Sequence, residues 1–313
     1  MRETGTSGIN KPPNPGNGPM LLSKRDSSDR GIRTPLVDLF VTRTGQTGKS
    51  PQVIIEDLVE NLRRQTGLAS ARSLDRYLEA RNVVERCTDS GIGCDGYIEP
   101  VGANFAEGFR MVLNDKVSPA RQRFTVAHEI CHTFFYELVP ELKFTPHATD
   151  DGEEALCNHG AAALLMPAHD IVAHTSGKDV SLATLEALAE RYEVSLEAIF
   201  LRLRGLKLWN CEMSVWHRMM SGDFVVSRLY GWLKKDWRWL DDSIPDRAWS
   251  RQDCSPVAGK AFVYCERPDN WSGAVSVYFQ MKRRGDNLIS LWATRKLAGA
   301  RRKGKANQQP LDI

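Results

Sequence analysis

The stretch His128-Glu129-Ile130-Cys131-His132 places two histidines four residues apart and a glutamate directly after the first. In an α-helix, residues with this spacing lie about 40° apart around the axis and one turn along it, so both imidazoles can reach one ion. Glu129 lies a quarter turn further round, where it is poorly placed to bind the ion but well placed to take a proton from a water molecule. The stretch predicts half of a hydrolytic metal site, with His128 and His132 as ligands and Glu129 as general base.

The residues around this stretch predict a long helix. Ser118 is a suitable N-cap and Pro119 a suitable first helical residue. Apolar residues then recur at helical spacing until Pro140, which ends the pattern. We therefore expect both histidines in the middle of one rigid helix.

A hydrolytic zinc site also needs a third protein ligand and a coordination position left for water. The nearest source is a second predicted helix, Glu153–Met166. Glu154 is the preferred ligand because it falls one turn before Asn158, and the small residues at 160–163 let the two helices approach closely. Glu153 is the alternative ligand, since spacing alone does not separate two adjacent carboxylates.

Each of these assignments has a structural alternative. The histidine pair can be an ordinary core or surface pair, which predicts no bound metal. A purely structural zinc site is usually closed by thiolates, and helical spacing does not aim the nearby Cys131 and Cys157 at the same ion. Asn158 is a candidate for supporting the metal site and His159 for stabilising an oxyanion, with helix packing and a surface histidine as their alternatives.

Two short strands are predicted ahead of the first helix, at Gly96–Val101 and Gly108–Asn114. An edge strand that leads into the metal helix can pair with an extended peptide, which satisfies backbone groups and demands little of the substrate's sequence. A purely structural hairpin is the alternative. On the first hypothesis, the candidate substrate-binding residues on this edge strand are Gly108, Phe109, Arg110, Met111 and Val112.

Three blocks of this sequence, in this order, resemble the ImmA/IrrE metallopeptidases. They are Arg123–His132 (RFTVAHEICH), Glu154–Asn158 (EALCN) and Ala163–Pro167 (ALLMP). Three linked blocks are far more specific than a five-residue motif. The resemblance covers roughly residues 85 to 206.

The resemblance implies roles for residues that match the family's motifs. His128, His132 and Glu154 would bind zinc, Glu129 would be catalytic, and the substrates would be helix-turn-helix repressors. Cys131 stands where the family often has glycine, and the pair after Asn158 is His-Gly instead of a bulkier pair. Neither departure touches a ligand, and together they make the chain more similar to the IrrE branch.

Residues 181–204 predict two capped helices around a short turn, similar to a helix-turn-helix. A DNA-reading second helix offers hydrogen-bonding or basic side chains to a major groove. This one offers Glu197 among apolar neighbours, with Arg202 and Arg204 only near its end. Similar paired helices occur in the resembled family between the peptidase and C-terminal domains, so the resemblance implies a scaffold here, with DNA reading as the alternative.

The last hundred residues differ in composition, since all eight tryptophans lie between Trp209 and Trp292. Alternating runs at 274–279 and 287–292 predict a hairpin in a separate α+β unit. In the IrrE branch a sensor-like GAF domain occupies this position. No motif here carries that assignment residue by residue, so it rests on position alone. Nine basic residues lie between Lys282 and Lys305, which we interpret as a solvated end, with nucleic-acid or acidic-partner contact as the alternative.

Composition predicts an intracellular protein. The 313 residues, 42% of them apolar, can bury a sizeable core in two domains. An odd count of seven cysteines without a C-x-x-C pair indicates reduced thiols in a cytosol. We find no run long enough to span a membrane and no signal-peptide core in the first thirty residues. Residues 1–49 are poor in apolar side chains and predict disorder, with folding from Ser50.

These observations predict an α+β protein with a helical zincin-like core, a small β-sheet, a helix-turn-helix-like pair and a separate C-terminal α+β domain. The expected units are a disordered extension at 1–49, a metallopeptidase domain at 50–178, the helix pair at 179–206, a C-terminal and sensor-like domain at 207–297, and a basic disordered tail at 298–313.

The predicted function is that of a cytoplasmic zinc endopeptidase that cleaves a helix-turn-helix repressor in a stress response, with a metal-activated water and Glu129 as general base. Manganese is the alternative ion. We expect a protein substrate and no membrane, with DNA binding not the primary activity. The alternative function is a DNA-binding or partner-binding regulator with a vestigial or structural metal site.

Overall fold

The structure is a computed structural model that describes most of the chain between residues 32 and 294. The described ranges are 32–67, 73–102, 107–139, 150–230, 238–239, 243–266 and 272–294. The first 31 residues of the extension predicted to be disordered, and the predicted basic tail at 298–313, lie outside these residues. The described residues form nine helices and two sheets, which confirms the α+β class.

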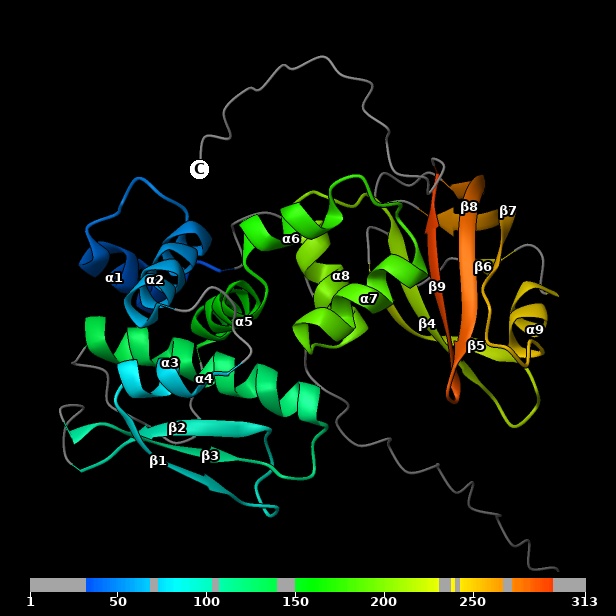
Figure 1. The fold of residues 1–313 in the computed structure, drawn as a ribbon. Helices are drawn as coiled ribbons and strands as arrows, with labels where there is room; N and C mark the ends of the chain where they lie inside the picture. Colours follow the sequence, from blue (N-terminus) through cyan, green and yellow to red (C-terminus); the bar gives the residue numbers. More distant parts are fainter. Residues whose placement is uncertain are drawn as a thin grey trace, which may run out of the picture.

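The N-terminal part of the molecule contains a small sheet and a stack of helices. Its elements are α1 (Pro35–Thr44), α2 (Pro51–Thr66), α3 (Asp75–Ala80), β1 (Val83–Thr88), β2 (Gly96–Pro100), β3 (Phe109–Leu113), α4 (Pro119–Leu138), α5 (Asp151–Leu165) and α6 (Ala168–Thr175). Figure 1 shows α4 lying along one face of the sheet, with α5 on the far side of α4. The long helix α4 is therefore covered from both sides.

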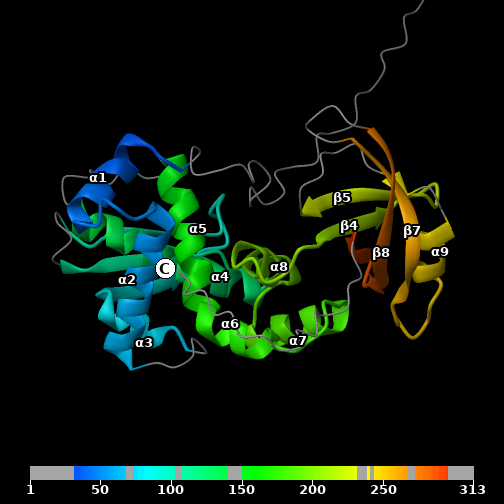
Figure 2. The same cartoon turned by 90° about the horizontal axis from the view of Figure 1, so that it is seen from above.

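The C-terminal part begins with the helix pair and continues into a larger sheet. Its elements are α7 (Leu182–Tyr192), α8 (Leu196–Gly205), β4 (Glu212–Arg218), β5 (Phe224–Tyr230), β6 (Arg238–Trp239), α9 (Ser243–Trp249), β7 (Val257–Glu266), β8 (Ser272–Arg284) and β9 (Asn287–Ala293). The pair lies between the N-terminal helices and the large sheet, as Figure 2 shows from above. The strands of this sheet are antiparallel in the order β5-β4-β9-β8-β7-β6, and the expected hairpin is β8–β9.

The strand order of the small sheet corrects one expectation. The order is β1-β3-β2, with β1 parallel and β2 antiparallel to β3. The predicted edge strand, with its candidate residues Gly108 to Val112, is therefore the central strand, and its backbone groups are bonded on both sides. No sequence pattern indicates β1, because its six residues, VVERCT, show no apolar alternation. In the structure they are exposed or half-buried. Among the described strands, β2 is the outer strand on one side of this sheet, and β1 is the outer strand on the other.

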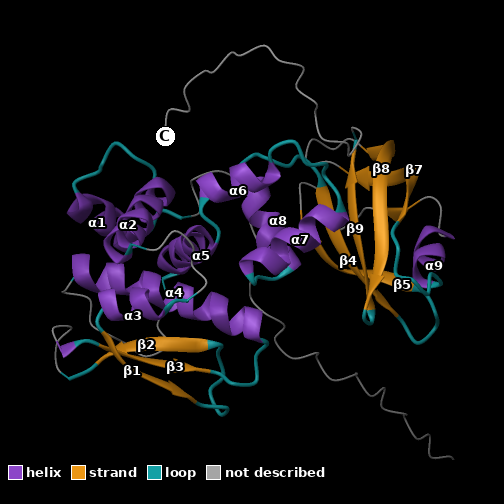
Figure 3. Cartoon of the chain, viewed as in Figure 1, coloured by secondary structure: helices purple, strands orange, loops and turns teal. Residues whose placement is uncertain are grey.

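A helix inside the predicted disordered extension is a second correction. Helix α1 is capped by Thr34, whose side chain accepts from the Val37 amide, and ends at Gly45 in the left-handed region. Its buried face includes Phe40, whose ring stacks on Phe135 of α4 at a centroid distance of 4.2 Å. The extension as a whole is polar, but three apolar residues at helical spacing are enough to bind this segment to the core. Figure 3 shows α1 packed beside α2.

The two helices predicted to carry the site are confirmed. Ser118 caps α4 by accepting from the Arg121 amide, and Asp150 caps α5 by accepting from two amides of its first turn. Gly160 explains their close approach, because a Cβ at this position would lie 2.7 Å from the Cys131 Sγ of α4 and 2.9 Å from Ile55 of α2. Close contact of this kind fixes α5 against both neighbours.

The large sheet shares its inner face with the helices and has a core of its own on the other face. Met213 and Leu291 belong to the same hydrophobic cluster as the N-terminal helices and α7–α8. Trp216 and Val277, with α9, form a second cluster. Polar contacts reinforce the first junction, since the Leu182 amide donates to Gln280 at 2.9 Å.

In the part of the chain that the structure describes, no helix has the length and apolar character needed to cross a membrane. The boundaries between the expected domains stay predictions.

Candidate metal centre

Three ligand atoms from two helices meet at one point. The Nε2 atoms of His128 and His132 on α4 lie 3.0 Å apart. The carboxylate of Glu154 on α5 lies 3.3 Å from the first nitrogen and 3.5 Å from the second. Atoms that bind a tetrahedral zinc ion at about 2.0–2.1 Å lie about 3.3 Å from one another. The donor set present therefore fits a zinc ion, and three protein donors leave one of its four positions for water.

The opposite nitrogen of each histidine is held by a residue of α5. His128 Nδ1 donates to the Asn158 side-chain oxygen at 3.0 Å, and His132 Nδ1 donates to the Glu153 carboxylate at 2.8 Å. A proton held on Nδ1 leaves the Nε2 lone pair directed at the ion, which is how metal-binding histidines are commonly oriented. The structure thus places Glu154 with the two Nε2 atoms and Glu153 behind His132.

His132, Glu153 and Cys157 form a second group whose ligand atoms also lie within 4.8 Å of one another. All three are buried, and burial raises the pKa of the Cys157 thiol well above its ordinary value. A thiol that resists deprotonation is a poor metal ligand. The group of His128, His132 and Glu154 is the better site because the pKa of its acid, Glu154, is lowered, so that the carboxylate form is favoured.

Glu129 lies on the side of α4 that faces the small sheet and is 5% exposed. Burial raises the pKa of its carboxyl, Glu154 adds to this, and the charges of His132 and His128 oppose it. The outward backbone N–H of Ile98, on β2, donates to this carboxylate. The side chain is thereby fixed next to the metal-binding atoms and can carry a proton at a higher pH than an exposed glutamate can.

The surroundings of the site are acidic. Burial lowers the pKa of His132, but the hydrogen bond to Glu153 and the charges of the nearby carboxylates outweigh burial and raise it to about 9. Burial opposes ionisation of Glu154 as well, and its pKa is nevertheless lowered by hydrogen bonding and charge from the two histidines. Three carboxylates around two imidazoles favour a bound cation.

The structure does not bring every predicted residue to this point. His159 faces α2, where its Nε2 lies 2.9 Å from Glu56, so it is not beside the metal-binding atoms as an oxyanion stabiliser would be. In β3, Phe109, Met111 and Val112 are buried, and Arg110 pairs with Glu99 of β2. These side chains serve the sheet and not an open substrate-binding edge.

Two contributors were missed by sequence reasoning. Glu153 was weighed only as a rival ligand, although its position next to Glu154 was a usable signal. Ile98 contributes a backbone N–H, and no side-chain pattern indicates such a role. Both roles depend on how α4 meets its neighbours.

The helix pair presents little to a DNA groove. Arg202 is 5% exposed, donates to the Met166 carbonyl and pairs with Glu56 of α2 at 2.6 Å. Arg204 lies near Glu212 and over the Phe200 ring. From Leu196 to Arg204, every residue of α8 is buried or half-buried. The second helix is therefore packed inside the molecule, where a recognition helix would need an exposed face.

A histidine pair on one helix and a glutamate on the next, with Glu129 beside them, form a candidate metal site of the kind expected in a zincin-like core. Residues 97–204 match the model of the Peptidase_M78 family, whose description is the IrrE N-terminal-like domain. The resemblance expected from the three sequence blocks is thus confirmed for this segment.

Two curated relatives carry the name radiation response metalloprotease IrrE. The protein of Deinococcus deserti is 38% identical over 99 residues, which cover 30% of this chain and 35% of the relative. The protein of Deinococcus radiodurans is 36% identical over 94 residues, which cover 27% of each. The chain therefore matches about a third or less of the length of these relatives.

Among solved structures, a Mycobacterium tuberculosis transcriptional regulator aligns over 83% of this chain and 81% of its own. The identity is 12% and the TM-score is 0.46.

Proposed function

We propose that this chain is a zinc-dependent endopeptidase. The observation that carries the proposal is the meeting of His128 Nε2, His132 Nε2 and the Glu154 carboxylate within 3.5 Å of one another, with Glu129 buried beside them. The family match over residues 97–204 and the metalloprotease names of the relatives support it. Manganese is the alternative ion for the same donors.

The chain's own residues would hold the ion and move the proton. When bound, a zinc ion would polarise the scissile carbonyl and make a water molecule more acidic. Glu129 takes the proton from that water and passes it to the leaving amine. Glu153 and Asn158 keep the two imidazoles in one tautomer and orientation, so that Nε2 of each histidine faces the ion.

We also propose that the substrate peptide adds to the outer edge of β2. The backbone groups of Asp95 and Val101 bond to the neighbouring strand, so the alternate residues Gly96, Ile98 and Pro100 direct theirs outward. One outward group, the Ile98 N–H, already reaches Glu129. A peptide that follows this edge passes directly over the catalytic carboxylate, and its recognition rests on backbone contacts.

The proposed substrate is a helix-turn-helix repressor, and the proposed outcome is relief of repression in a stress response. The resemblance to the ImmA/IrrE peptidases supports this choice. Such a substrate also implies a cytoplasmic location. The burial of α8 argues against the alternative of a DNA-reading regulator, since its arginines are engaged within the protein.

The first experiment measures bound metal by inductively coupled plasma analysis. Wild type should carry about one equivalent of zinc, and His128→Ala should lose it. The matched control is His169→Ala, which removes an exposed histidine and should leave the metal in place. Equal and near-zero metal in all three proteins would end the proposal.

The second experiment separates catalysis from binding. Glu129→Gln keeps the size of the side chain and should retain the ion, yet cleavage should fall by about 10²–10⁴-fold because the general base is lost. Glu137→Gln changes an exposed glutamate on the same helix and should cleave normally. The assay incubates each protein with helix-turn-helix repressors of the same organism and looks for a metal-dependent clip. Full activity of Glu129→Gln would mean that another group is the base.

A further inference from the structure

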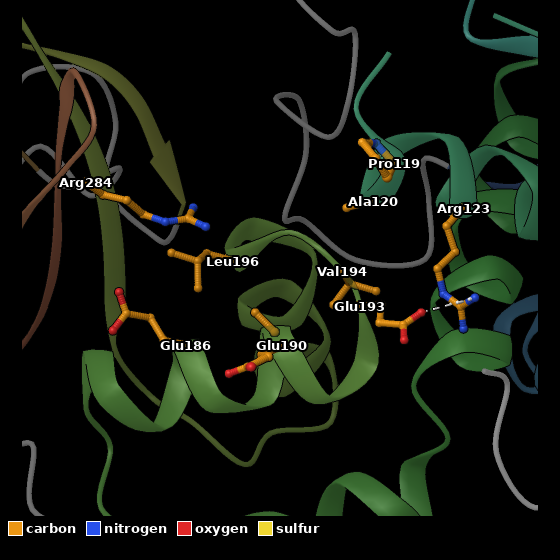
Figure 4. Close-up of a pocket in the computed structure, with 10 residues that line it drawn as sticks. Pro119, Ala120, Arg123, Glu186, Glu190, Glu193, Val194, Leu196 and Arg284 are labelled. Atoms are coloured by element: carbon orange, nitrogen blue, oxygen red, sulfur yellow. Dashed lines mark ion pairs between the residues drawn. The ribbon is translucent and has the colours of Figure 1, made fainter. Parts of the chain in front are cut away.

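An open cavity of about 590 Å³ lies between the first turns of α4, helix α7 and the end of β8. Figure 4 shows side chains from all three elements around it. Small-molecule sites commonly have volumes of about 300–1,000 Å³. The cavity is large enough for a small ligand, and its walls join the metal-bearing helix to the C-terminal sheet.

This cavity is separate from the metal centre. Arg123, one of the α4 residues that line it, precedes His128 by five positions, which turns it about 140° around the helix. The two sites therefore open on different faces of α4. Nothing at the metal centre accounts for the charges that line the cavity.

Charged groups face the cavity from both sides. Helix α7 contributes Glu186 and Glu190, which lie one turn apart, and its C-cap residue Glu193 also lines the cavity. Glu193 lies 3.6 Å from Arg123, as the dashed line in Figure 4 marks. Glu186 pairs with Lys282 of β8 at 2.9 Å. Two of the three carboxylates thus already meet a cation of the protein.

Glu190 and Arg284 are the exceptions among the described residues. Neither side chain forms an ion pair with any part of the chain that the structure describes, and both line the cavity, one from α7 and one from the end of β8. Leu196 and Val194 supply apolar surface in the same cavity. Among its described lining residues, the cavity therefore offers one carboxylate and one guanidinium that form no ion pair, together with an apolar wall.

We propose that this cavity binds a small molecule with a carboxylate and a cationic group separated by a short apolar chain. The ligand carboxylate would meet Arg284, where a guanidinium can form two parallel hydrogen bonds. Its cation would meet Glu190, and its chain would cover Leu196. A basic amino acid has this chemistry, and so does the C-terminal lysine or arginine of a peptide. A bound ligand would link α7 to the C-terminal sheet beside the catalytic helix.

Isothermal titration calorimetry on the full chain tests the proposal with 6-aminohexanoate as the probe. Hexanoate lacks the cation and hexylamine lacks the carboxylate, so each should bind at least about tenfold more weakly than the probe. L-lysine and Nα-acetyl-L-lysine distinguish the two sources. Tighter binding of L-lysine indicates a free amino acid, and tighter binding of the acetylated form indicates a peptide C-terminus.

The variants Glu190→Gln and Arg284→Gln should each weaken probe binding about tenfold, because each removes one charged partner. Asp286→Asn changes an exposed charge on the turn after β8 and should bind as wild type does. All three positions are exposed, and melting temperatures without ligand check that the variants stay folded. Binding does not use the catalytic carboxylate, so Glu129→Gln should bind the probe normally. No binding to wild type, equal binding of hexanoate, or full binding by both charge variants would overturn the proposal.

Discussion

At the scale of single residues, the metal centre depends on which of two adjacent glutamates faces the ion. Glu154 lies with the two Nε2 atoms, whereas Glu153 accepts a hydrogen bond from His132 Nδ1. The helical spacing of the histidines was predictable from five residues. The division of labour between two neighbouring carboxylates was not, because it depends on the rotation of α5 against α4.

This division predicts different metal affinities for two variants. Glu154→Gln removes a ligand and should abolish tight zinc binding, whereas Glu153→Gln removes only the charge behind His132 and should weaken it by about 10–100-fold. Competition with a chromogenic chelator measures both affinities, and Glu137→Gln is the control on α4. If Glu153→Gln lost more affinity than Glu154→Gln, the two roles would have to be exchanged.

At the scale of elements, the outer strand β2 can lie close against α4 because Gly96 has no side chain. A Cβ at Gly96 would lie 2.8 Å from Thr125 of α4 and 2.9 Å from the Val112 carbonyl of the neighbouring strand. Real Cβ atoms do not approach backbone this closely, so any larger residue displaces the strand. The position of the edge above Glu129 depends on this contact.

Gly96→Ala should therefore lower proteolytic activity about tenfold while zinc stays bound, since a displacement near 1 Å misplaces a substrate at the catalytic residue. Gly93→Ala is the matched control, because a Cβ there meets nothing within 4 Å. Rates with the repressor and metal content are measured on the same preparations. Unchanged activity in Gly96→Ala would argue against strand addition at β2.

Helix α1 contributes to the core although the segment around it is polar. Phe40 is fully buried and stacks on Phe135, one turn from His132 on α4. Phe40→Ala should lower the free energy of unfolding by about 3–5 kcal/mol, because it leaves a cavity beside the catalytic helix. Leu39→Ala, at an exposed neighbour, should change it by less than about 0.5 kcal/mol. Urea denaturation measures both free energies of unfolding. Equally small effects of the two variants would show that α1 is only loosely attached to the core.

At the scale of the whole molecule, two buried arginines tie distant helices to the end of α5. Arg63 of α2 donates to the Leu164 carbonyl at 2.8 Å, and Arg202 of α8 donates to the Met166 carbonyl at 3.0 Å. Cations at a helix C-terminus donate to its free carbonyls and interact favourably with the negative end of the helix dipole. Glu56 of α2 completes the group by meeting both Arg202 and His159.

Glu56 predicts how stability depends on pH. Burial raises its pKa, but hydrogen bonds and charge from His159 and Arg202 outweigh burial and lower it from 4.5 to about 2. The ionised carboxylate therefore stabilises the fold above pH 4.5, and this contribution is lost as the pH falls towards 2. In urea denaturation, the free energy of unfolding of wild type should be well above that of Glu56→Gln at neutral pH. The difference should shrink as the pH falls into the acid range.

Asp57→Asn, the adjacent position on α2, is the control for this prediction. Its carboxylate meets Lys49 and takes no part in the group around Arg202. The difference in free energy of unfolding between wild type and Asp57→Asn should stay small across the whole pH range. If the difference in free energy of unfolding between wild type and Glu56→Gln were constant across the acid range, the Glu56 carboxylate would not form an ion pair with Arg202.

The sequence alone determined the local features of this protein. The caps Ser118 and Asp150, the periodicity of α4 and the spacing of its histidines involve residues within a few turns of each other. Such signals are complete within a short window, so the two site helices and the β8–β9 hairpin could be predicted before any tertiary contact was known.

The tertiary structure decided everything that depends on contacts between distant residues. It inserted β1 beside β3 and so moved the open edge to β2, it placed Glu153 behind His132, and it buried Arg202 against Glu56. It also docked α1 and formed the cavity between α4, α7 and β8. Each of these outcomes is set by packing between segments that are far apart in the chain, and no local pattern of side chains carries that information.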